Sequence, residues 1–277
     1  MIAIKNLTFN YAKKQQPLFN ELDCELQTGS IVGLLGKNGA GKTTLLKLMI
    51  GLLFPQQGEI SILGHQPSKR QPSLLQDVFF VSEEFHLPPI SIKNFIKANA
   101  AFYPRFDQDL LHRLIKDFEL PETKSLQKLS YGQKKKFLIS FALATKCRLL
   151  VLDEPTNGLD IPSKSIFRKV LAGSLDEDQL VIISTHQVKD VENLIEKVLM
   201  LDNGKFIMQK DLYDISSSLN FSTVSSAEGE DVLYSEMVPG GYRIISPQIE
   251  GSSSHVDIEL LFNAIANGNE KLKKYVQ

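Results

Sequence analysis

Three consecutive segments within residues 30–53 constrain the fold of this chain more than any other feature. Ser30–Leu35 is a short apolar run that predicts a buried strand. A glycine-rich stretch, Gly36–Thr44, follows it with the sequence GKNGAGKTT. Thr44–Leu53 then has the apolar spacing of a helix, with Leu45, Leu46, Leu48, Met49 and Leu52 on one face. A strand that passes through a tight loop into a helix is typical of an α/β sheet.

The glycine-rich stretch matches the pattern G-x-x-x-x-G-K-[ST], which predicts a phosphate-binding loop. Gly39 and Gly41 would let the backbone approach a phosphate closely, and the helix N-terminus would favour the anion. Lys42 would bring a positive charge to the β- and γ-phosphates, and the Thr43 hydroxyl could ligate Mg²⁺. We expect Mg²⁺-ATP to contact Gly36, Lys37, Asn38, Gly39, Ala40, Gly41, Lys42, Thr43 and Thr44.

A second apolar strand, predicted at Leu149–Leu152, is followed directly by two acids. Ligands of α/β proteins bind at the carboxyl ends of sheet strands, so these acids would face the same edge as the loop. We expect Asp153 to hold Mg²⁺, directly or through water, and Glu154 to polarise the attacking water. Without the neighbouring loop, a solvated strand end would be the better interpretation.

Two further segments are suggestive only in that context. Ser130 and Gly132 open a helix predicted to begin near Tyr131, and a helix N-terminus attracts anions. His186 follows the predicted strand Leu180–Ser184, where it could sense a γ-phosphate, although a lone histidine is more often structural.

Taken together, the motifs resemble the nucleotide-binding domain of ABC transporters over about residues 1–210. Gly36–Thr44 is similar to the Walker A motif, and Leu129–Gln133 resembles the LSGGQ signature. Leu149–Glu154 resembles Walker B with its catalytic glutamate. The resemblance implies an ATPase of the P-loop NTPase fold, with an ABC-type β-subdomain and a helical insert.

Three shorter matches extend the resemblance. Asn157–Asp160 resembles the D-loop, His186 the switch histidine, and Tyr11 the aromatic residue that stacks on adenine. In this family two domains pair head to tail, and each ATP lies between the Walker A of one chain and the signature of the other. Ser130, Gly132 and Gln133 would therefore serve the nucleotide of the partner chain, and Asp160 would lie at the dimer interface.

Two positions depart from the family pattern. Tyr131 stands in the signature where glycine is usual, and Glu83 stands after the predicted strand Val78–Val81 where the Q-loop glutamine is expected. Glu83 could still ligate Mg²⁺, but its charge beside the metal and the γ-phosphate could alter metal affinity. A tolerated substitution is an equally good interpretation.

The remaining chain predicts the domain organisation. Apolar helical spacing indicates a helical insert at about residues 85–146, and strands alternate with helices again up to about residue 210. We expect strands at Ala3–Phe9 and Gly58–Leu63, helices at Pro162–Leu171 and His186–Ile195, and a hairpin turning at Asn203-Gly204. Residues 211–277 differ from the preceding chain in composition and pattern, and they predict a small α+β accessory segment. The run Lys134–Lys136 is consistent with a solvated helix face.

The function implied by the resemblance is that of an ATP-hydrolysing transporter subunit, at the inner, cytoplasmic face of the membrane. No apolar run approaches the roughly 18–20 residues needed to cross a bilayer, so the permease would be a separate chain. We expect a second ABC ATPase chain, identical or paralogous, and favour export because no importer regulatory domain is recognisable. Phe85–Ile90 would touch the permease or pack within the insert.

Two other functions stay open at this stage. One is a soluble ABC ATPase that acts in translation or DNA repair, and the other is an ATP-dependent module whose tail binds a regulator. The net charge of −1 gives no bulk electrostatic reason to bind nucleic acid, and we expect none.

Overall fold

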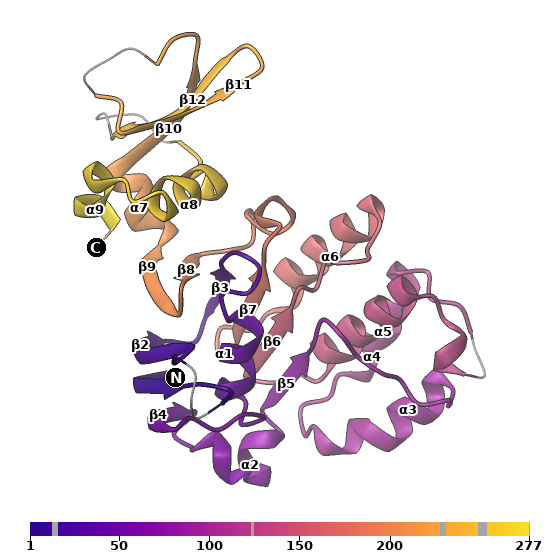
Figure 1. Cartoon of the computed structure of the whole chain (residues 1–277). Helices are drawn as coiled ribbons and strands as arrows, with labels where there is room; N and C mark the ends of the chain where they lie inside the picture. Colours follow the sequence, from indigo (N-terminus) through magenta and orange to yellow (C-terminus); the bar gives the residue numbers. More distant parts are fainter. Residues whose placement is uncertain (13–15, 123–124, 228–230, 249–253, 277) are drawn as a thin grey trace.

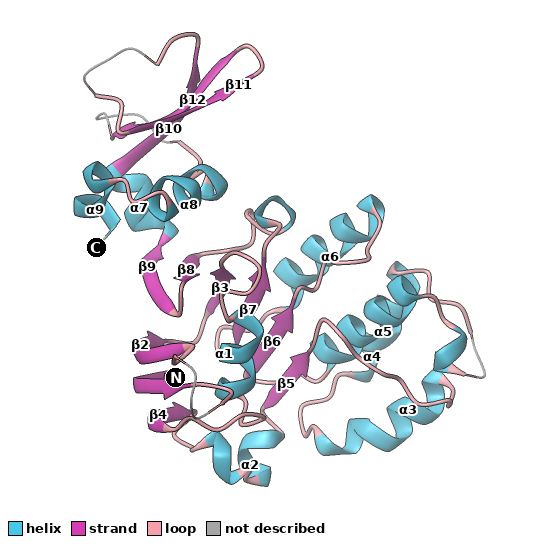
Figure 2. Ribbon diagram, in the orientation of Figure 1, coloured by secondary structure: helices cyan, strands magenta, loops and turns pink. Residues whose placement is uncertain are grey.

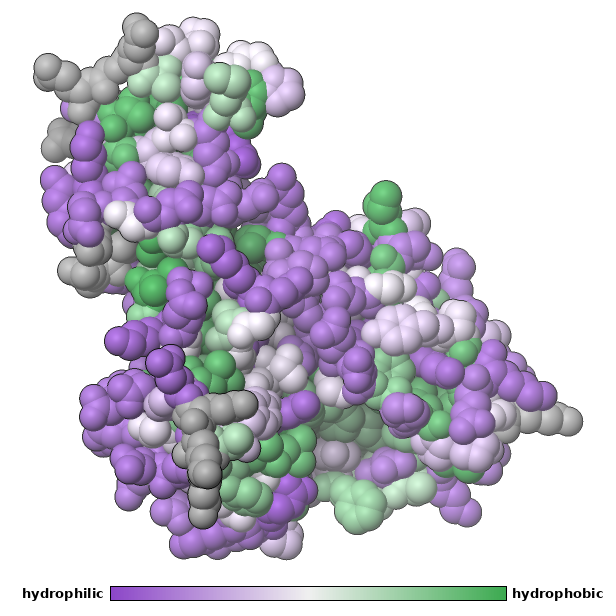
Figure 3. All heavy atoms as spheres, viewed as in Figure 1, coloured by the Kyte–Doolittle hydropathy of each residue, from purple (hydrophilic) through white to green (hydrophobic). Residues whose placement is uncertain are grey.

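The computed structural model describes residues 1–12, 16–122, 125–227, 231–248 and 254–276. Figures 1 and 2 show a central sheet with helices on its faces, a smaller sheet beside it, a helical region, and a C-terminal lobe. This mixed α/β architecture agrees with the predicted fold class. On the face shown in Figure 3, hydrophilic side chains cover most of the surface, as expected when the apolar ones fill the interior.

The central sheet has six strands in the order β5-β6-β7-β3-β8-β9. Its strands are β3 (Ser30–Leu35), β5 (Val78–Val81), β6 (Leu149–Asp153), β7 (Leu180–Thr185), β8 (Lys197–Asp202) and β9 (Lys205–Asp211). All neighbours are parallel except the hairpin β8–β9. The carboxyl ends of β3, β6 and β7 therefore meet at one edge, which is where the predicted site residues lie.

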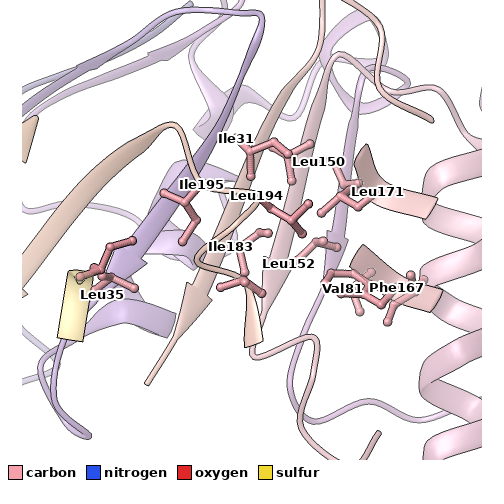
Figure 4. Close-up of a cluster of buried hydrophobic side chains, with 14 of the residues drawn as sticks. Ile31, Leu35, Val81, Leu150, Leu152, Phe167, Leu171, Ile183, Leu194 and Ile195 are labelled. Atoms are coloured by element: carbon pink, nitrogen blue, oxygen red, sulfur yellow. The ribbon is translucent and has the colours of Figure 1, made fainter. Parts of the chain in front are cut away.

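The central sheet is buried on both faces, and alternate residues of each strand enter different cores. In β3, Ile31 and Leu35 face one core, whereas Val32 and Leu34 face the other. Figure 4 shows the first of these cores, where Phe167 and Leu171 of α6 (Ile161–Ser174) pack near the strands. Helix α1 (Lys42–Met49) packs in the second core. Burial of both faces explains why these strands read as continuous apolar runs.

The second sheet is antiparallel and shares its core with α1. Its order is β2-β1-β4, formed by β1 (Ile2–Phe9), β2 (Phe19–Leu26) and β4 (Gln57–Ile62). The predicted strands β1 and β4 are present within a residue of their expected ends, and β2 was missed. Leu22, Cys24 and Leu26 of β2 are buried while the acids between them are exposed.

The helical region comprises α3 (Ile92–Asn99), α4 (Gln108–Asp117) and α5 (Tyr131–Ala144), whereas the short helix α2 (Pro72–Leu75) lies apart from it (Figure 1), with Leu74 in the second core. Ser91 caps α3 by accepting a hydrogen bond from Asn94 N, and Asp107 caps α4 by accepting one from Leu110 N at 2.8 Å. Such caps satisfy backbone donors that have no partner within the helix. Phe137 and Phe141 of α5 pack edge-to-face on Phe95 of α3, which ties the helices together.

The segment after β9 forms a lobe with its own sheet (Figure 1). It contains α7 (Leu212–Ser218), β10 (Leu219–Val224), β11 (Tyr234–Val238), β12 (Gly241–Pro247), α8 (Ile258–Ala266) and α9 (Glu270–Val276). The sheet order is β10-β12-β11, and all pairs are antiparallel. Strand β10 was not predicted. The lobe contacts the rest of the chain through an ion pair of 3.1 Å between Lys189 and Glu259.

The hairpin turn was predicted correctly, whereas one helix was not. Asn203 and Gly204 both have positive φ, 46° and 72°, as a two-residue hairpin turn of this kind requires. The helix predicted at His186–Ile195 is wrong, because the structure has only a 3₁₀ turn at Val188–Asp190. Its apolar residues recur every three positions, and Val191 with φ −134° leaves the helical region.

Candidate functional site

The predicted phosphate-binding loop forms the wall of a cavity of about 830 Å³. Tyr11, Glu83 and Glu154 line the same cavity from distant parts of the sequence. The loop contributes Lys37, Asn38, Gly39, Ala40, Gly41, Lys42, Thr43 and Thr44. Gly36 is not part of the cavity lining, and an added Cβ there would meet the Leu201 carbonyl oxygen at 2.5 Å. The structure thus brings together most of the residues expected to bind ATP.

Lys42 is held in place by its own loop. Its side chain is buried, and Nζ donates hydrogen bonds to the carbonyl oxygens of Gly36 at 2.7 Å and Lys37 at 3.3 Å. Burial lowers the pKa of this ammonium, while the carboxylates of Glu154 and Asp153 oppose the shift. The loop therefore presents a positive charge that is only partly solvated, which is suited to an anionic ligand.

Thr43 and Asp153 lie side by side at the end of β6, as expected of two residues that would share a metal ion. Thr43 Oγ1 donates to Asp153 Oδ2 at 2.8 Å, and Ser184 Oγ donates to Asp153 Oδ1. Within the described ranges, no cluster of three or more His, Cys, Asp or Glu residues forms a metal cage. The site offers only a few protein oxygens beside the phosphate-binding loop. This small number suits Mg²⁺, which usually keeps several waters and takes substrate phosphates as further ligands.

Glu154 is buried, and one of its carboxylate oxygens is engaged. Glu154 Oε1 accepts from the His186 backbone N at 3.0 Å and lies 2.8 Å from His186 Nδ1. Glu154 Oε2 is buried and has no hydrogen-bond partner among the described residues. A buried carboxylate oxygen without a partner is costly, so this atom marks the place where a water or ligand would bind.

The backbone at Glu154 is also unusual. Its φ is 45°, a left-handed conformation that is uncommon for a residue other than glycine and clusters at functional sites. The conformation follows the last strand residue, Asp153, and turns the next carboxylate toward the cavity that it lines. The two acids therefore lie at one strand end but have different neighbours.

Tyr11 presents an exposed aromatic ring beside the loop. Its side chain is 65% exposed, its hydroxyl lies 2.8 Å from Thr44 Oγ1, and its ring packs edge-on against Phe9. An exposed ring fixed at a cavity wall can stack on a planar base.

The signature residues and Asp160 do not line this cavity. Ser130 caps α5 in a capping box, because its Oγ accepts from Gln133 N and its backbone N donates to Gln133 Oε1. Gly132 lies against Gly158, where an added Cβ would meet the carbonyl oxygen at 2.8 Å. Asp160 caps α6 and accepts from Ser163 N at 2.9 Å, and hydrogen bonds from the side chain and then the backbone of Ser163 lower its pKa.

Glu83 lines the cavity, but its surroundings could not be predicted from the sequence. Its Oε1 accepts a hydrogen bond from Asn157 Nδ2 at 2.9 Å, and its backbone oxygen accepts one from the Tyr131 hydroxyl at 3.0 Å. One carboxylate oxygen is therefore already bound by a protein amide. No pattern in the sequence signalled Asn157 as its partner.

Lys135 contradicts the expectation of a solvated lysine face. It is fully buried, and Nζ donates to the backbone oxygens of Ser82 at 3.3 Å and Asp153 at 3.4 Å. Burial lowers its pKa to about 8, against the opposing effect of Glu83, Asp153 and Glu154. The sequence did contain a sign that Lys135 is buried, because Lys135 has helical spacing with the buried residues Ile139 and Ala142.

In the stretch Phe85–Ile90 the large apolar side chains pack inward, whereas His86, Pro88 and Pro89 are exposed. Leu87 is buried in the main core, and Phe85 and Ile90 pack partly against it. This arrangement favours the internal contact over a wholly exposed apolar docking segment.

A model of the ABC transporter family matches residues 19–157. The lantibiotic transport ATP-binding protein SrtF of Streptococcus pyogenes is 30% identical, over 79% of this chain and 94% of its own length. The SkfA peptide export ATP-binding protein SkfE of Bacillus subtilis is 32% identical, over 69% and 81%. The molybdate import ATP-binding protein MolC of Haemophilus influenzae is 31% identical, over 74% and 80%.

Solved structures show the same fold. The ATP-binding subunit of an ABC transporter superposes with a TM-score of 0.69, at 24% identity, over 78% of this chain and 91% of that one. A dimeric, post-hydrolysis ATP-binding cassette bound to ADP and Pi gives a TM-score of 0.66, at 23% identity, over 76% and 99%. In the described part of this chain, none of the helices is long and apolar enough to span a membrane.

Proposed function

This chain belongs to the ABC transporter family and is an ABC transporter ATPase, and from that premise we propose that it powers a separately encoded membrane permease that exports its substrate. The observation that carries the chemistry is the cavity, which Lys42, Thr43 and Glu154 line, while Asp153 lies directly behind it and accepts a hydrogen bond from Thr43. Residues from the end of β6 and from the loop before α1 meet there, as a phosphoryl-transfer site requires.

Each residue has a distinct role in the proposed reaction. The loop and Lys42 hold the phosphates, and Tyr11 stacks on the adenine. Thr43 and Asp153, with Glu83 nearby, would hold Mg²⁺, which when bound neutralises charge on the β- and γ-phosphate oxygens. Glu154 accepts the proton of the attacking water through Oε2, while His186 fixes its other oxygen.

We further propose that the working unit is a head-to-tail pair of ABC ATPase chains. Ser130, Gly132, Gln133 and Asp160 do not line the cavity of their own chain, which supports their use on the nucleotide of a partner. The N-terminus of α5 would then approach the phosphates from the opposite side. Whether the partner is identical or a paralogue follows from the subunits that purify together.

The relatives support export over import, because one is named for peptide export and two for Nod factor export, against one for molybdate import. Affinity purification of the native protein from solubilised membranes, followed by mass spectrometry, should recover an integral membrane protein. This chain would bind that permease at the inner face of the membrane. Recovery of ribosomes or nucleic acid in its place would contradict the transport role. Uptake of substrate in reconstituted vesicles would show the direction.

Glu83→Gln should raise the Mg²⁺ concentration needed for half-maximal ATP turnover by about 3- to 10-fold, since it removes a negative charge near the metal. The glutamine oxygen can still accept the hydrogen bond from Asn157, so the loop should stay in place. Mg²⁺ titrations of turnover and of nucleotide binding measure the effect. The exposed neighbour Glu84, changed to glutamine, is the matched control. Identical titrations for wild type and Glu83→Gln would show that this charge has no influence on the metal.

A further inference from the structure

The loop that carries Glu83 is attached to the rest of the site at two points. Its carboxylate accepts from Asn157 Nδ2 at 2.9 Å, and its backbone oxygen accepts from the Tyr131 hydroxyl at 3.0 Å. The attachments come from the loop after β6 and from the first residue of α5. Two hydrogen bonds from separate elements fix both the position and the direction of the Glu83 side chain.

Asn157 extends these contacts toward the proposed general base. Its backbone N donates to the Glu154 carbonyl oxygen at 3.3 Å, and its Oδ1 accepts from Gln187 Nε2 at 3.4 Å. Gln187 adjoins His186, which holds Glu154 Oε1. One asparagine therefore contacts the Glu83 loop, the backbone of Glu154 and the residue beside His186.

Tyr131 makes further contacts with the Glu83 loop and with the segment after Glu154. Its ring stacks on Phe85, with centroids 5.4 Å apart and planes at 22°. The ring also lies against Gly158, where an added Cβ would come within 2.5 Å of it. A glycine at position 131 would make neither the ring contacts nor the hydrogen bond to Glu83. The larger side chain thus connects the signature helix, the Glu83 loop and the segment after Glu154.

We propose that Tyr131, Glu83 and Asn157 form a latch that positions Glu154 for hydrolysis, with Tyr131 and Asn157 as positioning residues. The latch rests on the proposed role of Glu154 as the base. Because its contacts act on orientation and not on the phosphate-binding loop, losing it should lower kcat and leave ATP affinity and the KM for ATP nearly unchanged.

An exchange of donor and acceptor tests the central bond. Asn157→Asp places two carboxylates against each other, so it should lower kcat by about 10-fold or more. Adding Glu83→Gln supplies an amide donor to the new aspartate and restores the bond with its roles reversed. At saturating Mg²⁺, the double variant should recover at least about half of the loss on a logarithmic scale, relative to Asn157→Asp. If the two substitutions change kcat by independent factors that multiply in the double variant, the proposed latch is wrong.

A second pair of variants tests the tyrosine. Tyr131→Phe keeps the stacked ring and removes only the hydroxyl, so kcat should fall about 2- to 10-fold at unchanged ATP affinity. Tyr213→Phe, at a side chain that is 80% exposed on α7, is the control and should match wild type. Wild-type kcat in Tyr131→Phe would overturn the positioning role of the hydroxyl.

The two levels of inference fail separately. If wild type hydrolyses ATP and Glu154→Gln does not, Glu154 is supported as the general base. The Asn157, Glu83 and Tyr131 variants then test only the latch. If Glu154→Gln hydrolyses ATP as wild type does, the proposed base itself is wrong, whatever the exchange shows. Thermal melting of each variant and its binding of a fluorescent ATP analogue identify any loss of kcat that comes from misfolding.

Discussion

Glu154→Gln should lower kcat for ATP hydrolysis by at least about 100-fold and leave the affinity for ATP within about twofold of wild type. Glutamine has nearly the same shape and keeps an oxygen for the His186 backbone N–H. Its amide cannot accept the proton of the attacking water, and it replaces the unpartnered Oε2 by a donor. Phosphate release under steady state and calorimetric titration of ATP measure the two quantities.

The same variant also tests the proposed pairing. With ATP bound and hydrolysis blocked, the γ-phosphate should keep two chains together, so light scattering after gel filtration should show a dimer that needs ATP. Glu59→Gln, at an exposed position of β4, is the matched control and should hydrolyse ATP normally. Wild-type turnover in Glu154→Gln would mean that another group takes the proton.

Lys42→Ala should weaken ATP binding by about 10- to 100-fold, the value of one hydrogen bond between charged groups. The ammonium is held at the cavity wall by the Gly36 and Lys37 carbonyl oxygens, so its charge is already positioned before nucleotide binds. Without it, the loop would still offer backbone N–H groups but no positive side chain. Equilibrium titration with a fluorescent ATP analogue measures the dissociation constant.

The matched control for this second variant is Lys47→Ala, on the same helix but outside the cavity lining. Both variants remove one lysine from α1, so a difference between them reflects position and not net charge. Thermal melting without nucleotide checks that each variant folds. Unchanged ATP affinity in Lys42→Ala would contradict the assignment of the loop.

Local patterns predicted the central elements closely. Strands β3 and β5 have the predicted bounds. These features depend on contiguous residues, whose spacing and backbone preferences act within a few positions. Strand β2 was missed although Leu22, Cys24 and Leu26 alternate with acids, a pattern typical of a strand with one exposed face.

Errors arose where a local pattern had two physical solutions. Apolar residues between His186 and Ile195 suit a helix or a compact turn, and the return of the chain to β8 selects the turn. Glu196 N donates to the Ile31 carbonyl oxygen at 2.9 Å, which places the chain beside β3 within a few residues. The Lys134–Lys136 run had the same ambiguity, and packing buried its middle lysine.

The sequence by itself determined the candidate phosphate-binding loop, the two acids at the end of β6 and the family, because each depends on neighbouring residues whose spacing sets their chemistry. Only the tertiary structure decided which distant side chains meet. Glu83, Tyr131 and Asn157 come from three separate segments, and their hydrogen bonds exist because sheet order and helix packing bring those segments together. Residue identity records what a side chain can donate or accept, whereas the partner it finds depends on the whole fold.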